Sequence, residues 1–270
     1  MPSLEGSVAL VTGASRGVGK GVVLGLAEAG ATIFLTGRTL TGDGSLESTA
    51  AEAETLGGKC VCVACDHTND AETEAALARV VNDAGRLDLL VNSAWGGYEN
   101  MSEDGEFTYA KPFWQQKMWR WDAMFNAGVR AAFACARLAA RQMVEQGSGL
   151  IVNVSSLAGQ IYQGNTIYGV SKSATDRMVS DMAVELAPHG VSTVSIYPGL
   201  VRTENVLAAE FFDLSNSESP QFIGRAIAHL LSDPDIAAKS GSVVVAADLA
   251  AEYGFTDIDG KRPKALRNKI

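Results

Sequence analysis

Cysteine and histidine are scarce in this 270-residue sequence, which has four cysteines and three histidines. Cys62 and Cys65 form one C-x-x-C, which is compatible with a thiol redox pair or half a zinc site. No second such pair exists, however, and the histidines are scattered. The apolar run from Lys59 to Cys65 favours cysteines buried in a strand, because reduced cysteine is among the most buried residue types. We therefore expect no metal site and, by default, a reducing cytoplasmic compartment.

Long apolar runs and positive charge are also lacking. No stretch reaches 18 consecutive apolar residues, so no membrane span is expected. The first residues, MPSLEGSVALVTG, lack a basic region and a long apolar run, and we expect no signal peptide. The 22 Lys and Arg against 31 Asp and Glu give a net charge of −9. Because binding to a phosphate backbone needs a positive field, this charge argues against nucleic acid and favours a small, partly apolar substrate.

What is present is a regular alternation of short apolar runs and longer amphipathic segments. The expected strands are Val8–Thr12, Thr32–Thr36, Lys59–Cys65, Leu87–Asn92, Leu150–Ser155, Val191–Tyr197 and Gly241–Val245. The expected helices are Gly17–Ala29, Leu46–Leu56, Asp70–Ala84, Met118–Gln146, Ala174–Ala187 and Pro220–Leu231. The strands are apolar without alternation, as in parallel sheets buried on both faces. The sequence predicts an α/β protein with a doubly wound (Rossmann) parallel seven-stranded sheet and helices on both faces.

Two segments interrupt this alternation within what we expect to be a single domain over residues 1–270. Residues 95–121 hold all four tryptophans, and residues 200–219 carry Phe211 and Phe212 among polar residues. Both follow expected strands at the edge where open α/β sheets bind ligands. Long irregular segments in compact domains are usually lids or disordered, and we expect these two to be substrate loops.

A glycine-rich turn, TGASRGVG, joins the first strand to the first helix. Its spacing is G-x3-G-x-G, and such a turn lets backbone N–H groups approach a pyrophosphate at a helix N-terminus. A tight turn without a ligand is the alternative. The candidate dinucleotide-binding residues here are Gly13, Ser15, Arg16, Gly17, Val18 and Gly19.

The end of the second strand indicates which dinucleotide is preferred. An NAD site places Asp or Glu there, but this sequence has Arg38, with Arg16 as a second cation. A guanidinium pairs with a 2′-phosphate that a carboxylate would repel, so we expect NADP(H) rather than NAD(H). The alternative is that both arginines are solvated. Asp66, after the third strand, is a candidate for the adenine edge or a cap of the following turn.

Tyr168 and Lys172 are four residues apart, which places them on one face of a helix. A nearby ammonium lowers the pKa of a phenol, so we expect Tyr168 to work as an acid–base group. The fifth expected strand ends in Ser155 and Ser156, which offer a hydroxyl to a substrate carbonyl.

Together these motifs resemble the short-chain dehydrogenase/reductase family. The resemblance covers Gly6 to Asp259 and includes TGASRGVG, LVNSAWG, WDAMFNAGVRAAF, IVNVSSLAG, YGVSK and YPGLVRT. It implies that Tyr168 is the general acid/base and that Lys172 tunes it and binds ribose hydroxyls. It also implies that Ser156, followed by Gly159 in S-x-x-G, orients the substrate. Asn126 is similar to an asparagine that holds a relay water behind the lysine, although an Asn that kinks a buried helix is the alternative.

The resemblance also extends to further cofactor and substrate positions. Asn92 and Ala94 are similar to cofactor-facing residues, but Trp95 stands where the family has a small residue. The loop similar to the one that holds the nicotinamide carboxamide contains Pro198, Gly199, Val201 and Thr203. The substrate-pocket candidates, each with plain packing as the alternative, are Trp95, Tyr98, Tyr162, Val206, Leu207, Phe211 and Phe212.

The expected function is reversible hydride transfer between NADP(H) and a carbonyl or secondary alcohol. The aromatic segment KPFW…MWRWD and the tail from Ser240 resemble one family member in particular, which implies a bulky hydrophobic ketone, quinone or steroid-like substrate. A non-catalytic NADP(H)-binding redox sensor or scaffold is the alternative. The family resemblance further implies a homodimer or homotetramer that pairs the helices over 118–146 and 174–187.

Overall fold

Seven parallel strands form the central sheet of the computed structural model, which describes residues 1–209 and 212–266. The strand order is β11-β8-β7-β4-β1-β2-β3. The strands are β1 (Val8–Thr12), β2 (Thr32–Gly37), β3 (Lys59–Ala64), β4 (Leu89–Asn92), β7 (Gly149–Val154), β8 (Val191–Tyr197) and β11 (Val243–Val245). The predicted seven-stranded parallel sheet is confirmed.

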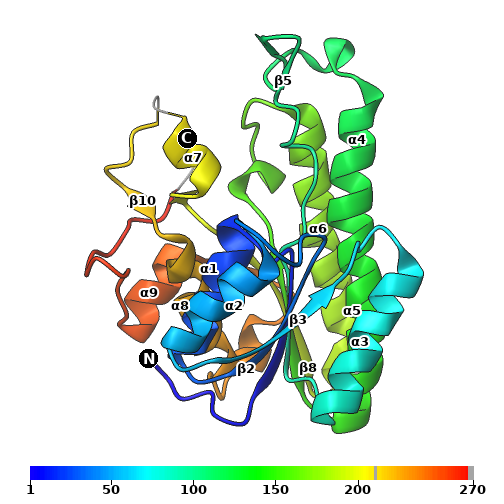
Figure 1. The fold of residues 1–270 in the computed structure, drawn as a ribbon, viewed down its shortest axis with the longest axis vertical. Coiled ribbons are helices and arrows are strands. Elements are labelled where there is room, and N and C mark those ends of the chain that lie inside the picture. Colours follow the sequence, from blue (N-terminus) through cyan, green and yellow to red (C-terminus); the bar gives the residue numbers. More distant parts are fainter. Residues whose placement is uncertain (210–211, 267–270) are drawn as a thin grey trace.

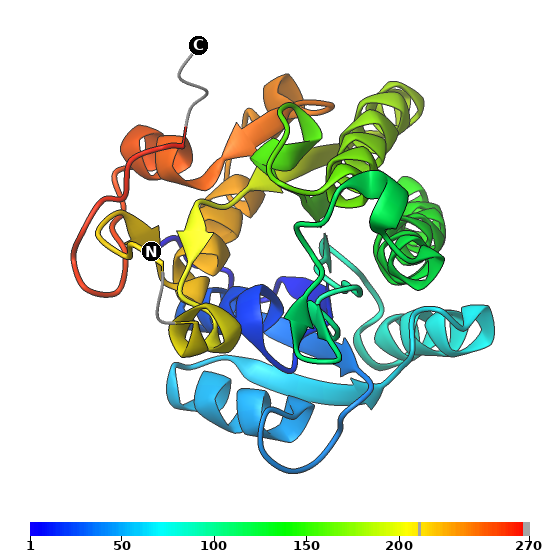
Figure 2. The same cartoon turned by 90° about the horizontal axis from the view of Figure 1, so that it is seen from above.

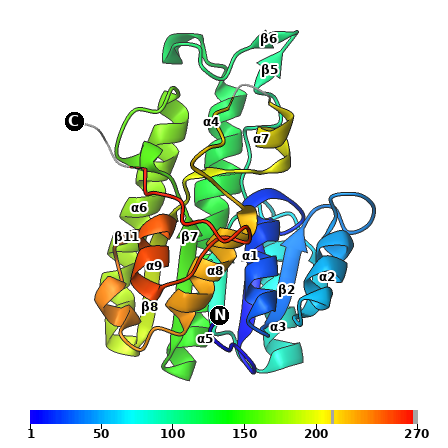
Figure 3. The same ribbon diagram turned by 90° about the vertical axis from the view of Figure 1, so that its left-hand side faces the viewer.

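Helices cover both faces of this sheet (Figures 1 and 3). One face carries α1 (Gly17–Glu28), α2 (Leu46–Thr55), α8 (Pro220–Leu231) and α9 (Ala246–Tyr253). The other carries α3 (Asp70–Ala84), α5 (Ala131–Gln146) and α6 (Thr166–Leu186). The doubly wound architecture is therefore confirmed.

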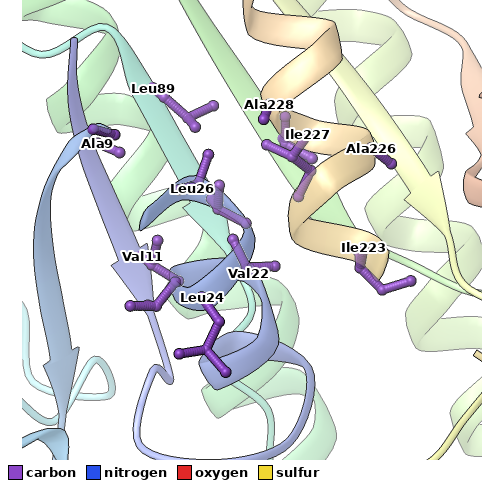
Figure 4. Packing of buried hydrophobic residues seen from close by; sticks show 14 of the residues in the cluster. Ala9, Val11, Val22, Leu24, Leu26, Leu89, Ile223, Ala226, Ile227 and Ala228 are labelled. Atoms are coloured by element: carbon purple, nitrogen blue, oxygen red, sulfur yellow. The ribbon is translucent and has the colours of Figure 1, made fainter. Parts of the chain in front are cut away.

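Side chains of β1 alternate between two hydrophobic cores, because successive strand residues point to opposite faces. Ala9 and Val11 pack in the core beneath α1 and α8. Val8 and Leu10 pack in the core beneath α3 and α5. Figure 4 shows the first core, where Val22 and Leu26 of α1 approach α8. Burial of both faces explains why the central strands are continuously apolar.

Glycines let α1 and α8 approach each other closely. A Cβ on Gly25 would lie 2.4 Å from the carbonyl carbon of Gly224, and a Cβ on Gly224 would lie 2.6 Å from the Gly21 oxygen. Such distances are far inside van der Waals contact, so backbone meets backbone at this crossing. This packing fixes the glycine turn that precedes α1 relative to the rest of the sheet.

The structure differs from several sequence-based expectations in burial and in element bounds. Strand β3 lies at the edge of the sheet, so Cys60 and Cys62 are only half-buried, whereas Cys65 just beyond it is buried. Helix α6 begins at Thr166 rather than Ala174, because the Asn165 side chain caps it by accepting a hydrogen bond from the Tyr168 N–H at 2.9 Å. The helix expected over 118–146 is α4 (Met118–Met124), a π-helical turn η2 (Phe125–Arg130) and then α5.

The two irregular segments lie at the end of the molecule where the strands have their carboxyl ends (Figures 1 and 3). The first contains the hairpin β5 (Ser102–Glu103) and β6 (Glu106–Phe107) and the short helix η1 (Phe113–Gln115). The second contains β9 (Leu200–Val201), α7 (Glu204–Ala208) and β10 (Ser217–Glu218). The remaining short helices are η3 (Leu157–Gly159), η4 (Ala187–His189) and η5 (Ile236–Lys239). Within residues 1–209 and 212–266, no helix combines the length and apolar character needed to cross a membrane.

Candidate active site

The order of strands changes direction beside β1, which pairs with β2 on one side and β4 on the other. Crossovers leave β1 and β4 toward opposite faces, and ligands of open α/β sheets bind at such a point, outside the carboxyl ends of the strands. Figure 2 looks onto this end of the molecule. The candidate cofactor-binding residues lie here, and so does the candidate acid–base group, Tyr168.

The glycine turn after β1 is held against neighbouring backbone. Gly13 has φ +66°, and a Cβ there would lie 2.8 Å from the Ala94 Cα. A Cβ on Gly19 would lie 2.1 Å from the Gly13 oxygen. The Thr12 hydroxyl accepts hydrogen bonds from the N–H groups of Ser93 and Ala94, both at 3.0 Å. The first and last of these glycines are therefore required by the turn itself.

The N-terminus of α1 already binds an anionic group of this chain. The Gly17 N–H donates to the Glu204 carboxylate, with an N–O distance of 3.1 Å to the nearer oxygen. Gly17 has φ +57°, and the preceding Arg16 is exposed and extended, with Val18 and Ser15 half-buried beside it. A helix N-terminus favours negative charge, and a pyrophosphate, like the carboxylate seen here, offers anionic oxygens that accept hydrogen bonds. The turn thus fits the phosphates of a dinucleotide.

Arg38 and Asp66 lie near each other at the ends of β2 and β3. Arg38 is 64% exposed, and its guanidinium lies 3.8 Å from the Glu99 carboxylate. Asp66 accepts hydrogen bonds from the N–H and hydroxyl of Thr68 at 3.0 and 2.8 Å, so it caps the turn that follows. These bonds, helped by the charge of Arg38, lower the pKa of the Asp66 carboxyl.

The Tyr168 hydroxyl is hydrogen-bonded to Ser156 and Tyr98. The Ser156 hydroxyl also accepts from the Ala158 N–H at 3.2 Å, which orients it at the start of η3. Ser155, in contrast, is buried and directs its hydroxyl to the Lys172 carbonyl. The structure therefore brings Ser156 and not Ser155 to the phenol.

Lys172 is buried one helical turn beyond Tyr168. Its ammonium donates to the Val154 carbonyl at 3.0 Å and lies 3.8 Å from the centre of the Trp95 ring. It also lies 5.7 Å from the centre of the Tyr168 ring. A cavity of about 10 Å³, close to the minimum that admits one water molecule, adjoins it. The cavity is lined by Asn92, Ala94, Trp95, Gly128, Ala132, Asn153, Val154, Lys172 and Thr175.

The expectation of a lowered Tyr168 pKa was wrong. Burial raises the pKa of the phenol, and the hydrogen bonds from Ser156 and Tyr98 offset this only in part. Burial also lowers the pKa of Lys172 to about 7, opposed by Asp176. Desolvation therefore disfavours the charged form of both groups and is the largest influence on each pKa.

Asn126, which the resemblance places behind the lysine, is not among the residues that line the cavity beside Lys172. Its side chain is exposed on the π-helical turn η2. The residue of η2 that lines the cavity beside Lys172 is Gly128. A π turn adds a residue to the helical turn, and so changes which residues face inward.

The loop after β8 is tied to the chain that follows it. The Gly199 N–H donates to the Glu218 carboxylate at 2.8 Å, and a Cβ on Gly199 would lie 2.8 Å from that carboxylate. Val201 is buried, and the Thr203 hydroxyl caps α7 by accepting from the Val206 N–H at 3.4 Å. Pro198, next to Gly199, is half-buried.

Of the substrate-pocket candidates, Trp95 and Tyr98 lie beside the phenol. Their ring centres are 5.6 and 6.0 Å from that of Tyr168. Val206 is half-buried, and Tyr162, Leu207 and Phe212 are exposed, at 73%, 55% and 39%. Phe211 lies outside the described residues.

Three residues that the sequence did not single out contribute to this site. Gly128 leaves room for the Trp95 ring. The sequence feature that could have indicated this role is a small residue inside a long predicted helix. Asn153, the register partner of Asn92 in the neighbouring strand β7, accepts from the Asn92 amide at 3.0 Å. Tyr109 is hydrogen-bonded to Tyr98, and no local pattern in its irregular segment indicates that contact.

Comparisons with known proteins agree with this geometry. A family model described as short chain dehydrogenase matches residues 7–210. Dehydrogenase/reductase SDR family member 1 of Mus musculus is 42% identical, over 97% of this chain and 86% of the relative. The Homo sapiens protein of the same name is 40% identical, over 96% and 85%. The solved structure of 7α-hydroxysteroid dehydrogenase with NADH and 7-oxo glycochenodeoxycholic acid has a TM-score of 0.76 at 27% identity, covering 90% of this chain and 93% of that one.

Proposed function

This chain belongs to the short-chain dehydrogenase family of nicotinamide-dependent oxidoreductases, and we propose that it interconverts a carbonyl and a secondary alcohol with NADP(H), using Tyr168 as the acid–base group. Residues 95–121 and 200–219 serve as the substrate loops of one catalytic domain. The observation that carries the proposal is the Tyr168 hydroxyl bonded to Ser156, with Lys172 one helical turn away, at the carboxyl edge of the sheet.

The proposed chemistry divides between cofactor and protein. When bound, the nicotinamide supplies the hydride for the carbonyl carbon or accepts it from the alcohol. Ser156 and Tyr168 hold the substrate oxygen, and Tyr168 gives it a proton in reduction and takes one in oxidation. A charged Lys172 stabilises the phenolate that remains and would bind ribose hydroxyls.

The residues that would hold the dinucleotide surround the glycine turn. The N–H groups at Gly17 and Val18 would face the pyrophosphate, and Asp66 the adenine. The nicotinamide half would lie against Asn92, Ala94 and the loop with Pro198, Gly199, Val201 and Thr203. The exposed guanidinium of Arg38, with Arg16 in the turn, supports a 2′-phosphate.

The substrate is proposed to be bulky and hydrophobic. The aromatic rings of Trp95 and Tyr98 beside Tyr168 support this class. The similar 7α-hydroxysteroid dehydrogenase was solved with a steroid, although its cofactor there was NADH. A cytoplasmic location and a homodimer or homotetramer stay predictions.

The function is tested by following NADPH oxidation with a panel of bulky ketones, quinones and steroids. The Tyr168→Phe variant should lose roughly 10²–10⁴-fold in kcat, because it has no proton to transfer, yet bind NADPH as tightly as the wild type. Fluorescence titration of NADPH checks the second point. Near-normal turnover by the variant contradicts the acid–base role, and NADPH binding without turnover of any substrate by the wild type favours a non-catalytic sensor or scaffold.

A further inference from the structure

The Lys172 ammonium is buried with little to compensate its charge. Among the described residues the Val154 carbonyl is the one hydrogen-bond acceptor found for it, and Asp176 is the charged group that acts on it. A buried ammonium carries three donors and is costly to desolvate. The group that covers it is the face of the Trp95 ring, whose centre is 3.8 Å from Nζ. This is well inside the distance at which a cation is attracted to an aromatic face.

Trp95 reaches this position because Gly128 has no side chain. A Cβ on Gly128 would lie 2.6 Å from Cζ3 of the indole and 2.7 Å from Cε3. The ring therefore lies directly on the backbone of the π-helical turn η2. Gly128 and Trp95 are 33 residues apart in the chain and meet beside Lys172, where both line the same small cavity.

The indole N–H does not explain this placement. Nε1 of Trp95 is buried and has no hydrogen-bond partner among residues 1–209 and 212–266. An unpartnered buried donor costs free energy. The indole N–H therefore destabilises the fold and does not explain why a tryptophan stands at this position. What the ring contributes is its face toward Lys172 and a T-shaped contact with Tyr168, at an interplanar angle of 84°.

We propose that Trp95 and Gly128 act together as a positioning device for Lys172: Gly128 admits the indole, and the indole face fixes the ammonium and favours its charged form. Trp95 is thus a positioning residue that acts on Tyr168 through the lysine, which deepens the proposed function and rests on it. The exposed Asn126 takes no part.

The effects of other ionisable groups near Lys172 must be separated from the effect of the Trp95 ring. Asp176 lies on the same helix, and its carboxylate accepts a hydrogen bond from Tyr197 of β8. Tyr168 lies one turn before the lysine, and Tyr98 of the irregular segment is bonded to Tyr168. Because Asp176 is the only one of these whose charge acts directly on Lys172, variants of Trp95 that leave it in place isolate the ring.

The inference is tested first in the cofactor-free protein, by NMR of lysine labelled at Cε. The Lys172 ε-methylene signal, assigned by its loss in Lys172→Met, should be shifted upfield by the indole ring current. Trp95→Phe, the matched control, keeps an aromatic face without the N–H and should retain most of this shift. Trp95→Leu should abolish the shift and lower the Lys172 pKa by roughly 0.5–1.5 units relative to Trp95→Phe. An equal or higher pKa in Trp95→Leu overturns the proposal.

A double-variant cycle tests the role of Gly128. Gly128→Ala alone should displace the ring and remove the upfield shift, whereas in Trp95→Leu the same change should have little further effect on the lysine signal. Additive effects of the two changes overturn the pairing.

If the wild type turns over a substrate, the pH at which alcohol oxidation rises should move upward in Trp95→Leu and stay nearly unchanged in Trp95→Phe. The lysine signals are read without substrate, so failure of the proposed function is distinguishable from failure of this inference.

Discussion

Arg38 is the residue on which the proposed preference for NADP(H) over NAD(H) rests. Its guanidinium is mostly exposed, and its contact with Glu99, at 3.8 Å, is a surface ion pair. Such pairs contribute little free energy because solvent screens them and two long side chains lose freedom. The guanidinium is therefore available to a phosphate, which it would bind by bidentate hydrogen bonds.

We expect Arg38→Asp to lower the ratio of kcat/KM for NADPH to that for NADH by about 10–100-fold, since a charge-assisted hydrogen bond is replaced by repulsion. Steady-state kinetics with both cofactors and one substrate measure the ratio. Glu99→Gln is the matched control: it removes the competing carboxylate and should leave the ratio equal or higher. An unchanged ratio in Arg38→Asp would mean that the arginine is only a solvated surface charge.

At the scale of elements, α7 and α1 are joined by a contact that would compete with the proposed binding of a dinucleotide at Gly17. Glu204, the first residue of α7, accepts the hydrogen bond of the Gly17 N–H at the start of α1. A pyrophosphate would need the same donor. Glu204 is exposed, so breaking the contact exposes no buried charge.

Glu204→Gln should therefore tighten NADP⁺ binding by about 2–5-fold, because a neutral amide competes less well for a helix N-terminus than a carboxylate does. Isothermal titration calorimetry of the cofactor-free protein measures the affinity. Glu47→Gln, at the start of α2, changes the net charge equally at a helix start that holds no candidate cofactor residue. If both variants raise the affinity equally, long-range charge and not the contact with Gly17 is responsible.

The central elements could be predicted from sequence because their causes are local. β1 and α3 were predicted with the bounds that the structure has, since each combines a clear apolar pattern with turn or capping residues at its ends. The start of α6 was missed because its cap, Asn165, follows an irregular stretch in which polar residues do not distinguish a loop from a cap. That Gly128 and not Asn126 meets the Trp95 ring could not be predicted, because this contact joins distant segments and depends on the π turn η2.

The site as a whole depends on contacts between segments that are far apart in the chain. The glycine turn, Arg38, and Tyr168 with Lys172 were recognisable by motif and by position after a strand. The bonds of Tyr98 to Tyr168 and Tyr109 were not, because the segment that carries them has no regular period. The same holds for two acidic residues that hold the loop after β8: Glu218 accepts from Gly199, 19 residues away, and Asp257 accepts from Arg202, 55 residues away.

Glu218 gives the whole molecule a pH-dependent stability. It is buried, accepts from the Gly199 N–H, and lies near Asp257 and Arg202. Burial raises the pKa of its carboxyl from 4.5 to about 7, with Asp257 adding to the rise and Gly199 and Arg202 opposing it. Between these two values the folded protein binds more protons than the unfolded chain, so the free energy of unfolding falls as pH rises.

Glu218→Gln should flatten this fall, because the amide keeps an oxygen for the Gly199 N–H and does not titrate. The wild type should lose roughly 2–3 kcal/mol relative to the variant between about pH 4.5 and 7, on the basis of about 1.4 kcal/mol per unit of pKa shift. His67, whose pKa burial lowers to about 4, changes stability in the opposite direction but equally in both proteins. Urea unfolding at a series of pH values measures the difference. Parallel curves for the two proteins would show that Glu218 is ionised in the fold without penalty, and that the charge of Arg202 outweighs its burial.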